Sequence, residues 1–329
     1  NKLTMLDWVQ ELIEVGERTG ARVHFTHMKA RGATYWGSSH AAISLINRAR
    51  ARGVRVFGDQ YPYTTSGSDG NVTLIPAWAL GQERWGESQG MPSDYREALR
   101  ATLGDPSKAE GLRRDIQHEV TYRGGGENII VFDHPDPSYI GKSVAELAAT
   151  NGQTIVEFAI SMQLEGFQDR PGGARVRAFS FSEEDIEALA SQPWVATASD
   201  GGIALPEDGP STHARYYGTF PRKIRRYALD RGVISVEWAV RSATSLPAQI
   251  LGLRSRGLVR EGFEADLVVM DLDQVRDMAT FEDPHQFASG IEYVLVNGEF
   301  VVDGEGNPTG GLPGVVITRD EGRAPPSVQ

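Results

Sequence analysis

Helical and strand-like segments alternate along this chain at spacings that few folds accommodate. Residues 4–19 and 41–52 carry apolar side chains at helical spacing. Short apolar segments near 22–27, 54–59 and 194–199 have the pattern of strands. Alternation of this kind is typical of parallel strands joined by helices. We therefore expect an α/β protein whose short strands form a parallel sheet.

Two stretches depart from this alternation. Residues 61–192 are interpreted as a long insertion, because the strand-to-helix loops of parallel barrels accept such additions. Residues 251–329 contain short strands, two of them joined by Asn297 and Gly298, a pair that favours a type I′ hairpin. The sequence thus predicts a main unit over 1–250 that carries the insertion, followed by a small β domain and tail.

Composition excludes several kinds of protein. A formal net charge of −11 argues against a nucleic-acid footprint, which needs clustered Lys and Arg. The sequence holds no cysteine, so thiolate metal ligands and disulfides within the chain are excluded. No apolar run approaches the roughly 20 residues that span a membrane, and the acidic, amphipathic start is unlike a signal peptide. We expect a cytoplasmic protein with neither membrane nor nucleic-acid partners.

The strand-like segments end in residues that can perform chemistry. The first ends in His27, the second in Asp59 and the third in Asp200. Because side chains alternate along a strand, His27 shares a face with Val23 and Phe25 and is expected on the inward face of the sheet, whereas His24 should point toward the helices. A histidine and carboxylates at one edge can bind a metal or activate water. The alternative is a hydrogen-bonded rim histidine and, before two glycines, a turn aspartate.

Several motifs resemble one family. The chain is similar to the C-terminal part of the N-acyl-D-amino-acid deacylases (D-aminoacylases), which belong to the metal-dependent amidohydrolase superfamily. The similar stretches, in chain order, are THMKARG, GDQYPYTTS followed by LIPAW, YIGKSVAEL, SDGG, HARYYGTFPR, SATSLPAQILGL, and RGLVREGFEADLVVMD with GIEYVLVNGEFV. The ADLVV segment alone indicates only the superfamily.

The resemblance implies a fold and a site. The fold is the C-terminal part of a (β/α)8 TIM-type barrel, its last strands, with a small β-sandwich domain. His27 is implied as a zinc ligand, and Asp200 as a residue of the metal centre that acts as general base and acid. Basic and tyrosyl side chains are implied to hold the substrate carboxylate; the matching positions are Lys29, Tyr61, Tyr63 and Arg215, with Arg215 the best candidate for an ion pair. The alternative for each is a surface or packing residue, and Tyr63 could equally anchor the insertion.

The other metal ligands of the family have no counterpart in the sequence. These ligands are a His-x-His pair, a bridging ligand and a further histidine from earlier strands. One histidine and one aspartate are too few for a zinc site, and three strands cannot close a barrel. We therefore expect one or two zinc ions whose remaining ligands come from a companion polypeptide carrying the N-terminal barrel half, a separate gene product or a cleaved piece.

The expected reaction is hydrolysis of the amide bond of small N-acyl-D-amino acids by this completed zinc site. Two alternatives stay open. A cyclic-amide hydrolase of the same superfamily shares the metal chemistry, and a non-catalytic scaffold or binding subunit needs none of it. The joint presence of His27, Asp200 and Arg215 favours the enzyme.

Overall fold

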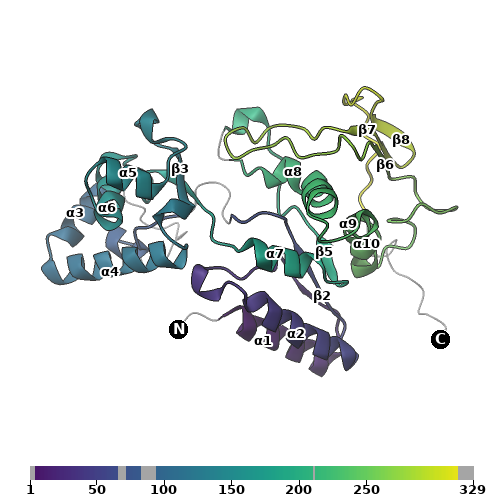
Figure 1. Ribbon diagram of the computed structural model, residues 1–329, viewed down its shortest axis with the longest axis horizontal. Coiled ribbons are helices and arrows are strands. Elements are labelled where there is room, and N and C mark those ends of the chain that lie inside the picture. Colours follow the sequence, from purple (N-terminus) through teal and green to yellow (C-terminus); the bar gives the residue numbers. More distant parts are fainter. Residues whose placement is uncertain (1–3, 66–71, 83–93, 210–211, 318–329) are drawn as a thin grey trace.

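The computed structural model describes residues 4–65, 72–82, 94–209 and 212–317. The described residues form three groups of elements, which Figure 1 shows: a parallel sheet with helices, a helical unit with a two-stranded sheet, and C-terminal helices with an antiparallel sheet. The predicted α/β class is confirmed. Within the described ranges, none of the helices is both long and apolar enough to cross a membrane.

The parallel sheet contains the three strand-like segments that the alternation indicates. Its strands run in the order β1 (Val23–Phe25), β2 (Val56–Gln60) and β5 (Val195–Thr197). Helices α1 (Met5–Thr19), α2 (Ser38–Ala51) and α7 (Glu183–Ala190) pack on one face. The sheet does not close into a barrel, and no further strand covers its two edges in the described part of the chain.

The strand faces differ from those expected. Val23 and Val56 are buried in the core formed with α1 and α2, and Phe25 packs against that core. The interpretation that Val23 and Phe25 point inward was therefore wrong, as was the expectation that His24 points toward the helices. His24 lies on the opposite face, where its ring contacts the Asp59 carboxylate. The physical reason is that the covering helices bury the outer face of the sheet, so apolar side chains suit that face as well as an interior.

A second unit lies within the stretch interpreted as an insertion. Strands β3 (Ile129–Asp133) and β4 (Arg175–Ala178) pair antiparallel. They pack with helices α3 (Tyr95–Leu103), α4 (Pro106–Tyr122), α5 (Val144–Thr150) and α6 (Ile155–Glu165). The unit has its own hydrophobic core and stands apart from α1 and α2 in Figure 1. The helix α7 belongs to the same stretch of sequence, yet it packs against α2 and the parallel sheet.

The C-terminal part begins with helices. Helix α8 (Arg215–Arg222) continues into a π-helix over Lys223–Asp230, and α9 (Val236–Ala243) and α10 (Ser245–Leu251) follow. Strands β6 (Leu267–Met270), β7 (Ile291–Val296) and β8 (Glu299–Val302) then form one antiparallel sheet. The predicted hairpin between β7 and β8 is confirmed, because Asn297 and Gly298 have φ values of 50° and 84°. The described residues show this single sheet rather than a sandwich of two.

Candidate active site at the ends of the parallel strands

His27 and Asp200 both lie in backbone turns just after a parallel strand. His27 follows β1 with a φ of 43°, and Asp200 follows β5 with a φ of 47°. Among the described residues, Asn297 is the one other non-glycine residue with positive φ. Left-handed backbone is costly for residues that have a Cβ, and such conformations cluster at functional sites. Both side chains lie at the surface that the carboxyl ends of the strands form.

Asp59, at the end of β2, joins the turn of His27 to the sheet. Its Oδ1 accepts a hydrogen bond from the backbone N–H of His27 at 2.6 Å. Its Oδ2 lies 2.6 Å from Nε2 of His24, and its backbone carbonyl accepts from the N–H of Met28 at 2.8 Å. Asp59 therefore holds the turn that carries His27.

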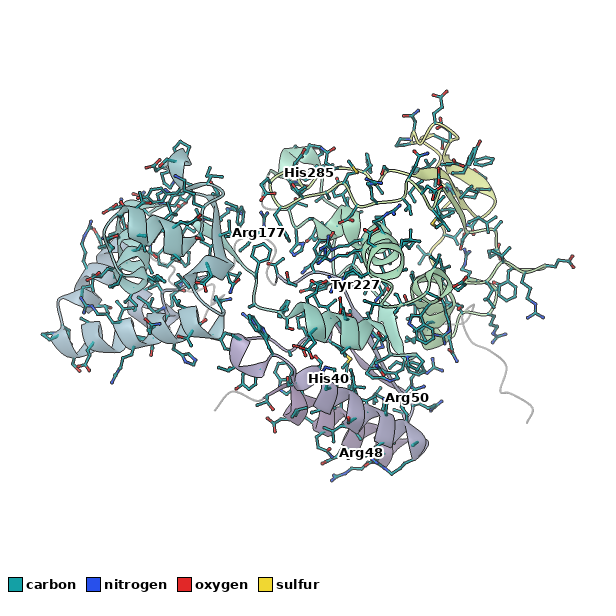
Figure 2. The ribbon with its side chains drawn as sticks, viewed as in Figure 1. His40, Arg48, Arg50, Arg177, Tyr227 and His285 are labelled. Atoms are coloured by element: carbon teal, nitrogen blue, oxygen red, sulfur yellow. The ribbon has the colours of Figure 1, made fainter. Side chains whose placement is uncertain are left out.

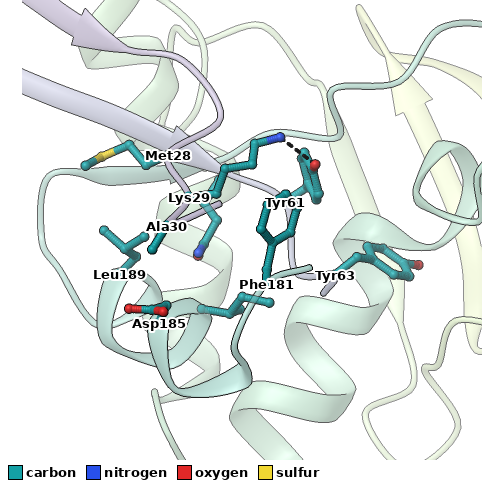
Figure 3. Close-up of a pocket in the computed structure, with 10 residues that line it drawn as sticks. Met28, Lys29, Ala30, Tyr61, Tyr63, Phe181, Asp185 and Leu189 are labelled. Carbon is teal, nitrogen blue, oxygen red and sulfur yellow. Dashed lines mark hydrogen bonds between the residues drawn. The ribbon is translucent and has the colours of Figure 1, made fainter. Parts of the chain in front are cut away.

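Four of the predicted site residues form one continuous cluster. The Arg215 guanidinium lies 3.2 Å from the Asp200 carboxylate and 4.6 Å from the centre of the Tyr61 ring. The Lys29 amine donates to the phenolic oxygen of Tyr61 at 2.5 Å, as Figure 3 shows. The structure thus brings two cations, a phenol and a carboxylate to the ends of β1, β2 and β5.

Burial changes how this cluster ionises. Loss of hydration lowers the pKa of Lys29 to about 8, with the nearby Arg215 acting in the same direction and Asp200 opposing both. Burial also raises the pKa of Tyr61 to about 12, so its hydroxyl keeps its proton at neutral pH. Lys29 is therefore a cation that can lose its charge near pH 8, beside a phenol that stays neutral.

A buried cluster of aromatic rings contacts the backbone of Arg215. Nδ1 of His213 accepts a hydrogen bond from the Arg215 backbone N–H at 3.0 Å. The His213 ring lies 5.3 Å from the ring of Tyr63 and 5.2 Å from that of Phe281. Burial lowers the pKa of His213 well below its usual range, so its ring stays neutral. Tyr63, predicted to hold substrate, is 4% exposed and packs in this cluster.

Arg177 connects the insertion to the segment that precedes α8. This residue of β4, labelled in Figure 2, donates to the carbonyls of Phe281 at 2.5 Å and of Thr212 at 3.1 Å. Its guanidinium also lies 4.0 Å from the centre of the Phe132 ring. Arg177 has no signal in the sequence, because contacts between such distant segments leave no local pattern. His213 likewise acts through contacts with segments distant in sequence, such as Phe281.

The residues present fit zinc in kind but not in number. An imidazole nitrogen from His27 and a carboxylate oxygen from Asp200 are ligands that zinc accepts. However, catalytic zinc sites use three protein ligands, and the described residues contain no group of three His, Cys, Asp or Glu side chains able to hold a metal ion. The residues that the structure describes thus supply only part of a zinc site.

The pocket behind Lys29 and Tyr61 is not large enough for a substrate. It lies between the strand ends and α7 and is lined in part by Met28, Phe181 and Leu189 (Figure 3). Its cavity volume is about 10 Å³, which leaves room for at most one water molecule. This pocket therefore cannot enclose a small organic molecule.

Comparisons with known proteins identify the family of this chain. The sequence model described as "Amidohydrolase family" matches residues 92–302. That match covers more than half of the chain, so the chain belongs to the amidohydrolase family.

Within the family, the chain is homologous to deacylases of N-acyl-D-amino acids. It is 32% identical over 312 residues to the N-acyl-D-glutamate deacylase of Alcaligenes xylosoxydans xylosoxydans, covering 95% of this chain and 51% of the relative. It is 30% identical over 290 residues to the D-aminoacylase of the same organism, covering 88% and 47%. The chain spans about half the length of the curated relatives it matches.

Two solved structures show the same partial likeness. A crystal structure of D-aminoacylase matches 93% of this chain and 52% of its own, with a TM-score of 0.62 and 28% identity. The N-acyl-D-glutamate deacylase from Bordetella bronchiseptica, solved with zinc and a phosphonate inhibitor, matches 90% and 51%, with a TM-score of 0.60 and 29% identity.

Proposed function

We propose that this chain forms part of the active site of a zinc-dependent amidohydrolase that removes the acyl group from N-acyl-D-amino acids. The observation that carries the proposal is the cluster of Asp200, Arg215, Tyr61 and Lys29 at the carboxyl ends of three parallel strands. In parallel barrels this edge is where active sites assemble. The homology to D-aminoacylases supports the same reading.

Arg215 and Lys29 bind the carboxylate of the substrate in this proposal. A guanidinium forms paired hydrogen bonds with a carboxylate, and the ammonium adds a second positive charge. Arg215 lies 3.2 Å from Asp200, so a substrate whose carboxylate contacts Arg215 has its amide, two bonds away, close to the Asp200 carboxylate. Recognition of the carboxylate thus places the bond to be cleaved beside the base.

His27 and Asp200 hold zinc in this proposal, together with ligands from outside the 329 residues. When bound, zinc lowers the pKa of water and polarises the amide carbonyl. Asp200 takes the proton from the attacking water and delivers it to the departing nitrogen, as a general base and then a general acid. In this proposal the Tyr61 hydroxyl, which burial keeps protonated, donates a hydrogen bond to the substrate.

A companion polypeptide completes the site in this proposal. The three parallel strands belong to a (β/α)8 barrel whose remaining strands, and remaining zinc ligands, lie outside this chain. The open edges of the sheet and the absence of a third ligand in the described ranges support this arrangement. The share of the relatives covered, about half, supports it as well.

The test is hydrolysis of an N-acyl-D-amino acid by the assembled zinc protein and its Asp200→Asn variant. We expect kcat to fall by roughly 10²-fold to 10⁴-fold, which is the usual contribution of a general acid–base residue. Asp133→Asn is the matched control, because Asp133 also ends a strand but pairs with Arg175 in the insertion. Unchanged hydrolysis in Asp200→Asn would contradict the proposal. Faster cleavage of a cyclic amide would favour a cyclic-amide hydrolase.

A further inference from the structure

We propose that Asp59 is a positioning residue, which fixes the turn after β1 and thereby directs the His27 imidazole toward the metal. The inference rests on the proposed role of His27 as a zinc ligand. It concerns a residue that contacts the backbone of the ligand rather than the metal itself.

The turn of His27 is attached to β2 by two hydrogen bonds to one residue. The Asp59 carboxylate accepts from the His27 N–H at 2.6 Å, and the Asp59 carbonyl accepts from the Met28 N–H at 2.8 Å. A Cβ at Gly58 would meet the Met28 sulfur at 2.5 Å, so the Met28 side chain packs directly on the backbone of β2. The end of β2 therefore contacts the turn through the hydrogen bonds that Asp59 accepts and through this packing.

His27 needs this support because its own side chain provides none. Its φ of 43° places a residue with a Cβ in the left-handed region, which the isolated chain disfavours. No hydrogen bond of its imidazole to another described residue is seen, and the residue is exposed. The turn thus sets the direction of the Cα–Cβ bond from which the ring extends, and a short hydrogen bond from an N–H to a carboxylate is a strong one.

The second oxygen of Asp59 is also occupied. Oδ2 lies 2.6 Å from Nε2 of His24, on the open face of the sheet. With Oδ1 bound to His27 and Oδ2 bound to His24, both carboxylate oxygens have partners. This arrangement favours a positioning role over direct metal binding, and His24 fixes the plane of the carboxylate.

The decisive variants are Asp59→Ala and Asp59→Asn in the assembled protein, with Asp133→Ala as the matched control at the end of another strand. Zinc affinity is measured by competition with a chromophoric chelator, with no substrate present. We expect Asp59→Ala to weaken zinc binding roughly 10-fold to 100-fold, as is usual when a group that supports a metal ligand is removed. Asp59→Asn keeps an oxygen that accepts from the His27 N–H, so we expect it to restore most of the affinity.

A second readout follows the hydrogen bond itself. In amide NMR spectra, the His27 N–H should resonate downfield and exchange slowly in the wild type and in Asp59→Asn, and lose both features in Asp59→Ala. A loss of zinc affinity in Asp59→Asn as large as in Asp59→Ala would overturn the inference, because it would indicate a direct ligand. Unchanged affinity in Asp59→Ala would also overturn it.

His27→Ala separates this inference from the proposed function. If His27→Ala loses zinc and Asp59→Ala does not, only the positioning role fails. If His27→Ala binds zinc as the wild type does, the proposed metal site itself fails.

Discussion

The insertion and the parallel sheet differ in how far their own residues bury their apolar surface and pair their backbone groups. The insertion has a core of fully buried residues, including Leu99, Leu112 and Phe158. Side-chain N-caps begin its four main helices, at Asp94, Asp105, Ser143 and Thr154. The parallel sheet has three strands, two open edges and covering helices on one face.

This difference places the well-packed core and the candidate site in separate parts of the molecule. The insertion closes its core with its own residues, whereas the sheet presents the Asp59 and His24 side chains, strained turns and a buried cation at its open side. Open strand edges pair readily with other segments. In the proposed function, the region that carries the chemistry is thus also the region that a companion polypeptide completes. Three kinds of substitution test this comparison.

The largest expected effect on stability is in the insertion. Phe158 is 1% exposed, so Phe158→Ala leaves a cavity that should lower the free energy of unfolding by about 3–5 kcal/mol. If the insertion is an independent unit, its denaturation midpoint should fall while zinc affinity stays the same. Chemical denaturation followed by circular dichroism measures the first, and chelator competition the second. A zinc affinity that falls together with stability would show that the insertion is not independent of the candidate site.

Removing the buried guanidinium of Arg215 should have a comparable effect on catalysis and little effect on the stability of the insertion. Arg215→Ala leaves the Asp200 carboxylate without its partner and removes the group proposed to bind the substrate carboxylate. We expect a loss of about 2–5 kcal/mol of transition-state stabilisation, or roughly 30-fold to 4,000-fold in kcat/KM. Steady-state kinetics measure this change. Arg18→Ala, on an exposed face of α1, is the control, and an equal loss there would contradict the role of Arg215.

The smallest expected effect is a pH dependence of the free energy of unfolding that arises from Lys29 in the candidate site. Burial lowers the pKa of Lys29 from 10.5 in the unfolded chain to about 8 in the folded protein. Between these values the unfolded state binds more protons, so the free energy of unfolding rises with pH from about 8 to 10.5. The full change is up to about 3 kcal/mol, at about 1.4 kcal/mol for each pKa unit.

Lys29→Met removes the amine to which this pH dependence of stability is assigned. We expect the variant to lose the rise in stability above pH 8, which denaturation measured at several pH values will show. Substituting Lys108, on the surface of the insertion, should leave the rise in place. A wild-type stability that is flat over this range would show that Lys29 is not held in a desolvated position.

Much of the fold follows from local sequence signals. Helix α1 begins where Thr4 provides an N-cap, the parallel strands follow the alternation of apolar segments, and Asn297 and Gly298 form the expected hairpin. These features depend on neighbouring residues, so their patterns are visible in the chain. The identity of several site residues came instead from a resemblance between motifs.

Other features depend on contacts that no local pattern records. The face on which His24 lies was mispredicted, because alternation gives the periodicity of a strand and not which side the helices cover. The positive φ of His27 and the bonds from Arg177 to Thr212 depend on segments distant in sequence. The completion of the metal site cannot be derived from this chain, because its described residues contain too few ligands.

The most direct test of the account is native mass spectrometry of the protein purified from its source, because one spectrum reports both polypeptides and bound metal. The account predicts a complex of this chain with a second polypeptide that carries one or two zinc ions, and cleavage of N-acyl-D-amino acids by that complex. A metal-free species that consists of this chain alone and lacks activity would contradict it.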